Sequence, residues 1–124
     1  MESIASDNAP AAIGPYCQAI KTGNFVFCSG QLGIDPTTGN LAPDVEGQTR
    51  QIFRNLTAVL KAASLTLQNV AKTTVFLASM DDFATVNAVY AEVFGGHKPA
   101  RATVEVSRLP LNAHIEVECI AVSG

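Results

Sequence analysis

Two charged residues in the C-terminal quarter of the chain, Arg101 and Glu116, have the side chains best suited to chemistry. Each lies in a segment where apolar and polar residues alternate, 99–106 and 115–122, as in a half-buried β-strand. Arg101 directly follows Pro99-Ala100, so its guanidinium is expected at the mouth of its strand. There it could hold a carboxylate through two parallel hydrogen bonds. A solvated strand-end arginine is the other interpretation that the residues allow.

The connection between these two strands contains Pro110 and Asn112, so the chain is expected to turn back there and the two strands to be antiparallel partners. Arg101 and Glu116 then lie at opposite ends of the sheet, about 15 Å apart at about 3.4 Å per residue. If both serve one small-molecule site, one of them must come from another subunit.

Composition limits the classes of protein that the chain can belong to. A length of 124 residues with 48% hydrophobic content predicts a single domain, 1–124, that needs no disulfide or metal to hold its core. A net charge of −3, with 8 scattered Lys and Arg residues, argues against a nucleic-acid partner. No stretch is apolar enough to span a membrane, and residues 1–16 resemble neither a secretory signal nor a transit peptide. We therefore expect a cytoplasmic protein.

The cysteines and histidines do not suggest a metal site. Cys17, Cys28 and Cys119 are odd in number, fall in apolar strand patterns and form no C-x-x-C motif, which favours reduced thiols. His97 and His114 have no ligand-like spacing to cysteine or carboxylate. No bound metal is expected.

The order of predicted elements is β-β-α-β-α-β-β, preceded by a short strand around Ile4. Mixed parallel and antiparallel pairing then gives an α+β fold with a mixed sheet of five to six strands. Two helices can cover only one face of it, so the apolar side chains of the other face predict self-association. The other predicted elements are a hairpin of 16–21 and 25–29 around Gly23-Asn24, a helix over 44–64 capped by Asp44, a strand over 70–77, and a helix from the Asp81-Asp82 cap to Phe94.

Many short motifs in register resemble the RidA family (YjgF/YER057c/UK114), also known as endoribonuclease L-PSP. The resemblance runs from about residue 13 to residue 122. The motifs are Gly14-Pro15-Tyr16, Ser29-Gly30-Gln31, Asp35-Pro36-x-Thr38-Gly39, the KTTVFL run at 72–77, Phe83-x-x-Val86-Asn87-x-x-Tyr90, Pro99-Ala100-Arg101 and Ile115-Glu116-x-Glu118-x-Ile120-Ala121.

The resemblance implies a chorismate-mutase-like fold and a homotrimer whose three sheets face a central barrel, with sites between subunits. It also implies an enzyme that hydrolyses reactive 2-imino acids, such as 2-iminobutanoate and 2-iminopropanoate, to 2-oxo acids and ammonia. No cofactor is implied, and the chain has no Walker loop, G-x-G-x-x-G motif or obvious Schiff-base lysine.

The same resemblance assigns expected roles to individual residues. Arg101 would clamp the substrate carboxylate, and Glu116 would hold or activate the attacking water. Tyr16 and Ser29 would line the cleft and orient the substrate. Gly30 would allow a close approach of the chain beside the site, although a turn at the end of a strand explains this glycine equally well.

Thr103 departs from the family pattern, which most often has a cysteine two residues after the arginine. If this position contributes a backbone carbonyl to the site, threonine supplies it equally well. If thiol reactivity matters at this position, threonine cannot supply it.

Two other functions remain open at this point. Family members have also been described as endoribonucleases or translation inhibitors, although this chain has no basic stripe and no histidine pair for RNA cleavage. The second alternative is a non-enzymatic module that binds small carboxylates or acts as a chaperone.

Overall fold

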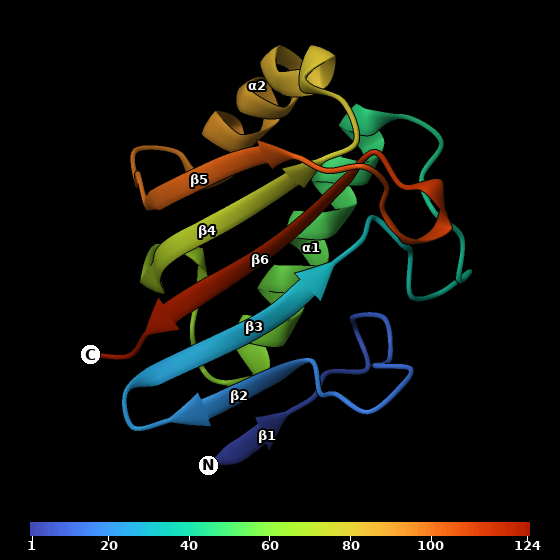
Figure 1. Ribbon diagram of the computed structural model, residues 1–124. Helices are drawn as coiled ribbons and strands as arrows, with labels where there is room; N and C mark the ends of the chain where they lie inside the picture. The colour runs from blue at the N-terminus through green and yellow to red at the C-terminus, as the bar shows by residue number, and fades with distance from the viewer.

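Six strands form one mixed sheet, and two helices pack on one of its faces (Figure 1). The computed structural model describes all of residues 1–124. The predicted mixed α+β architecture is confirmed. The strands are β1 Glu2–Ile4, β2 Ala19–Thr22, β3 Phe25–Gln31, β4 Val70–Leu77, β5 Ala100–Glu105 and β6 Ile115–Val122, and the helices are α1 Val45–Ala62 and α2 Phe83–Phe94.

The strand order, β1-β2-β3-β6-β4-β5, corrects one prediction. β5 and β6 are not partners, because β4 lies between them, parallel to β5 and antiparallel to β6. The connection 106–114 is longer than the about two to five residues of a tight hairpin, so it can carry the chain past β4. β5 and β6 nevertheless run in opposite directions, as predicted.

The local predictions hold with small shifts at the element ends. β2 and β3 form the expected hairpin, but β2 begins at Ala19, not at Tyr16. The Asp44 carboxylate accepts a hydrogen bond from the Gly47 amide at 2.7 Å, which confirms it as the cap of α1. Asp82 makes no such bond at the start of α2. Asp82 is still the N-cap residue of α2, so the predicted position of the cap is confirmed without its hydrogen bond. A short 3-10 turn, Met80–Asp82, precedes the helix and is capped by Ser79.

The core lies between the sheet and the helices, which occupy the same side of the sheet (Figure 1). Strand residues alternate, so that Val75 and Val117 are fully buried under the helices. On the other face, called the open face here, Phe25 is 48% exposed, Phe27 43% and Val104 43%. The prediction that two helices leave one apolar sheet face uncovered is confirmed for the single chain. Neither helix is long and apolar enough to cross a membrane.

Candidate functional site

Arg101 lies on the helix-covered side of the edge strand β5, where its register partner is Thr73 of β4. Its Nη1 donates a hydrogen bond to Asn87 Oδ1 of α2 at 2.7 Å. Its guanidinium carbon also lies 4.8 Å from the centre of the Tyr90 ring and 5.7 Å from that of Phe83. Arg101 is therefore held by α2, unlike a freely solvated strand-end arginine.

A cleft of about 520 Å³ opens beside Arg101, between the C-terminal half of α2 and the start of β5. Its lining includes Lys98 and Arg101 but no aspartate or glutamate. A positively charged cleft without acidic side chains favours an anionic ligand, and the planar fork of an arginine is suited to a carboxylate.

Tyr90 forms the floor under Arg101, and its hydroxyl is paired with that of Thr73 at 2.7 Å in the buried core. Burial raises the pKa of Tyr90, so the hydroxyl stays protonated at neutral pH. Asn87 and Tyr90 are functional candidates that the sequence predictions missed. Their spacing from Phe83, four and seven residues, is the signal that could have found them, because it puts all three on one face of α2.

Glu116 lies near the start of β6, on the open face, and accepts no hydrogen bond from the chain. Its carboxylate occupies the space beside Gly30, where a Cβ atom would fall only 2.1 Å from Glu116 Oε2. Burial and the charge of Glu118 raise the pKa of Glu116. A half-buried, unpaired carboxylate with a raised pKa has the properties of a general base.

Gly30 belongs to a β-bulge, because Ser29 and Gly30 together lie opposite the single residue Glu118 of β6. It is not at the end of its strand, since β3 continues to Gln31. Of the two explanations for this glycine, a turn and a close approach, the structure supports the close approach, and the approaching group is the Glu116 side chain.

A groove of about 370 Å³ lies at this end of the sheet, between the N-terminal loop and the end of β3. Gly30 and Tyr16 both line it, and the Tyr16 side chain is 55% exposed. The structure therefore brings Tyr16, Gly30 and Glu116 to one region.

The two hydroxyl candidates differ in their surroundings. Ser29 Oγ donates to the Cys17 carbonyl at 2.7 Å, so this hydroxyl ties the N-terminal loop to β3. Thr103 lies on the covered side of β5, opposite Val75, and its Oγ1 is buried without a hydrogen-bond partner. Thr103 therefore lies on the same face of the sheet as Arg101, and Glu116 lies on the opposite face.

Arg101 and Glu116 are far apart within one chain, as the sequence predicts. In addition, they lie on opposite faces of the sheet. Their register partners on β4 are Thr73 and Phe76, which point to opposite faces of the sheet. Three residues along the strands and two strand spacings across them separate the Cα atoms by about 14 Å. One subunit cannot bring these side chains to the same ligand.

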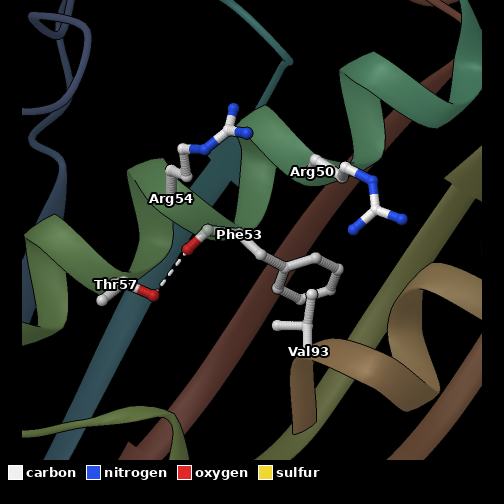
Figure 2. A pocket seen from close by; sticks show the side chains of 5 residues that line it. All are labelled: Arg50, Phe53, Arg54, Thr57 and Val93. Carbon is white, nitrogen blue, oxygen red and sulfur yellow. Dashed lines mark hydrogen bonds between the residues drawn. The ribbon is translucent and has the colours of Figure 1, made fainter.

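A groove of about 360 Å³ between the outer surfaces of α1 and α2 lacks free reactive groups (Figure 2). Its Arg50 is already paired with Glu46 and Glu92, and Thr57 Oγ1 donates to the Phe53 carbonyl at 2.6 Å. Figure 2 shows both arginine side chains, Arg50 and Arg54, directed away from Thr57. No group of three or more His, Cys, Asp or Glu side chains is placed to hold a metal ion.

The electrostatic coupling of Glu116 to Glu118 gives a first testable prediction. Removing the Glu118 charge by Glu118→Gln should lower the pKa of Glu116, because the ionised Glu116 would lose a repulsive neighbour. NMR titration of the labelled glutamate carboxyl groups measures this shift. Glu2→Gln, on the edge strand β1, is the control and should leave Glu116 unchanged. An unmoved Glu116 titration in Glu118→Gln would contradict the coupling.

The fold and the two candidate regions define a class of small α+β proteins with an arginine beside a cleft that has no acidic side chains and with a separate, unpaired carboxylate. The family model for Endoribonuclease L-PSP matches residues 6–123. The 2-iminobutanoate/2-iminopropanoate deaminase of Salmonella typhimurium is 50% identical over 98% of this chain and 97% of its own.

Two solved structures from Escherichia coli have nearly the same fold. TdcF with bound serine has a TM-score of 0.97 at 41% identity, covering 100% of both chains. The YjgF gene product has a TM-score of 0.95 at 45% identity, also covering 100% of both chains. This chain belongs to the RidA family.

Proposed function

We propose that this protein hydrolyses 2-imino acids, such as 2-iminobutanoate and 2-iminopropanoate, to 2-oxo acids and ammonia. The observation that carries the proposal is Arg101, held by Asn87 and Tyr90 beside a cleft without acidic side chains. Such a site favours a small carboxylate. The name of the Salmonella relative, a 2-iminobutanoate/2-iminopropanoate deaminase, supports the reaction type.

In the proposed mechanism Arg101 binds the substrate carboxylate and so fixes the position of the adjacent C2 atom. Glu116 removes a proton from a water molecule while the water oxygen forms a bond to C2 of the protonated imine. The protonated Glu116 then returns the proton to the amine nitrogen. The C2–N bond breaks and its electron pair leaves with ammonia, while Glu116, ionised again, accepts the hydroxyl proton as the oxygen becomes the 2-oxo group. Carbon is neither oxidised nor reduced.

The proposed site is shared between subunits, because Arg101 and Glu116 lie on opposite faces of one sheet. A homotrimer in which the open faces surround a central barrel would cover the exposed Phe25 and Phe27. It would also allow Arg101 of one subunit to approach Glu116 of the next.

The assembly gives a second prediction. The wild-type chain should sediment as a trimer at micromolar concentration, and Phe27→Glu should shift it to monomers, because a charge would enter an apolar contact. Phe27 is 43% exposed in the single chain, so this change should not unfold the subunit. Thr57→Glu, on the exposed side of α1, is the control and should remain trimeric. A wild-type monomer at this concentration would contradict both the assembly and the shared site.

The enzymatic test generates imines in place from several amino acids with an amino-acid oxidase. The expected result is faster release of ammonia and 2-oxo acid when the protein is present. Unchanged release with every amino acid would contradict the proposed reaction and favour a carboxylate-binding module.

RNA cleavage is the second candidate function, supported by the name of the matching family model. It is tested by incubating the same preparation with RNA, with Arg101→Ala and Glu116→Gln alongside. Cleavage that neither change affects would indicate a contaminating nuclease.

The unpaired state of all three cysteines supports the further proposal of a reducing, cytoplasmic location.

A further inference from the structure

We propose that Tyr90, anchored by Thr73, is a positioning residue that sets the plane of the Arg101 guanidinium. The inference rests on the proposed function, in which Arg101 holds the substrate carboxylate. It adds a residue that acts through Arg101.

The Tyr90 ring is fixed at its hydroxyl end and along its sides. The hydroxyl is paired with Thr73 Oγ1 at 2.7 Å, and Thr73 is only 1% exposed. Phe53 meets the ring edge-on at a centroid distance of 5.7 Å, and Phe94 packs against it at 4.7 Å. A ring held in this way has little freedom to tilt, so it presents a fixed surface.

The Arg101 guanidinium packs on this surface of the Tyr90 ring. Its guanidinium carbon lies 4.8 Å from the ring centre, within the range of a cation–π contact. Nη1 donates to Asn87, which fixes the rotation of the guanidinium, while the remaining N–H groups are free to bind a ligand. Bidentate binding of a carboxylate requires the two planar groups to be aligned, so the ring that carries the guanidinium sets the orientation of the ligand.

Thr73 connects the ring to the strand that carries Arg101. It is the direct register partner of Arg101 on the neighbouring strand β4. The same position of the sheet therefore fixes both the backbone of Arg101 and the hydroxyl of Tyr90. If these two positions only had to fill space in the core, phenylalanine could replace Tyr90 and valine could replace Thr73, and no hydroxyl group would be buried.

The experiment measures binding of 2-oxobutanoate by calorimetry and imine hydrolysis by steady-state kinetics. Tyr90→Leu should weaken 2-oxobutanoate binding about 2- to 30-fold, the range for loss of one cation–π contact, with KM raised accordingly. Tyr90→Phe combined with Thr73→Val keeps the aromatic face but removes the anchor. It should lower kcat more than it weakens binding, because the guanidinium keeps its contact and loses its fixed plane.

A double-mutant cycle with Arg101→Ala separates positioning from general packing. Tyr90→Leu should weaken binding in the wild-type background and have no further effect in the Arg101→Ala background. Val26→Ala is the control, because Val26 is fully buried on β3, two strands away from β4, and has no part in holding the Tyr90 ring. It should lower the melting temperature and leave 2-oxobutanoate affinity unchanged.

Three results would overturn the inference while leaving the proposed function intact: normal binding and kinetics in Tyr90→Leu, an equal loss in the Arg101→Ala background, or the same loss in Val26→Ala. A wild-type protein that neither binds 2-oxobutanoate nor hydrolyses imines would overturn both the inference and the proposed function.

Discussion

Replacing Arg101 by lysine is expected to reduce imine hydrolysis by about 10²-fold, the cost of a displacement near 1 Å at a reacting centre. Lysine keeps the positive charge but replaces the planar fork with a single ammonium group. It also cannot lie flat on the Tyr90 ring and donate to Asn87 as the guanidinium does. Arg101→Ala should be at least as inactive, because it removes the charge as well.

Neither Arg101 substitution should affect folding or assembly. Arg101 is an exposed residue of an edge strand, and its removal leaves no buried charge unpaired. Imine hydrolysis, 2-oxo acid binding, thermal stability and sedimentation should be measured on all three forms. Arg54→Lys is the matched control on α1, since the side chain of Arg54 donates its hydrogen bond to Gln51 of its own helix and lies outside both candidate regions. Near-normal hydrolysis by Arg101→Ala would refute the assigned role, and a parallel loss of stability would make Arg101 structural.

Glu116→Gln is expected to lower kcat by about 10²- to 10⁴-fold, because an amide cannot take a proton from water. The carboxylate-binding group, Arg101, is untouched, so 2-oxo acid affinity should be retained. Steady-state kinetics and calorimetry on the same preparation distinguish the two effects.

Stability provides an independent check on Glu116→Gln. Burial raises the pKa of Glu116 in the folded chain above its unfolded value. The ionised side chain therefore costs folding free energy at pH values above the unfolded pKa, with the full cost present once the pH exceeds the folded pKa. Glutamine removes that cost, so the variant should be at least as stable as wild type at neutral pH.

The control for this prediction is Glu118→Gln, two residues along the same face of β6. Because Glu118 raises the pKa of Glu116, this variant should move the acidic limb of the pH–rate profile to lower pH and keep the plateau rate. A normal turnover rate in Glu116→Gln together with a collapsed rate in Glu118→Gln would transfer the role of base to Glu118.

Local structure was predictable where side-chain periodicity is strong. β4 has its predicted bounds, Val70–Leu77, because it is rich in β-branched and aromatic residues. β6 has its predicted bounds, Ile115–Val122, because apolar and polar residues alternate along its first half. The α1 cap at Asp44 and the turn before Phe25 follow from equally local chemistry. The start of α2 was less predictable, since two consecutive aspartates signal a cap without showing which side chain can reach the helix amides.

The sequence by itself determined which segments are helices and which are strands, and that β5 and β6 run in opposite directions. It also determined that two helices can cover only one face of the sheet. Only the tertiary structure decided which strands are neighbours, because alternation identifies buried side chains without identifying the strand beside them. Along β5 the apolar and polar residues alternate but the burial of their side chains does not, since an edge strand is largely exposed on both faces. The placement of Arg101 over Tyr90, and of Glu116 on the opposite face beside Gly30, therefore depended on contacts between residues far apart in the chain.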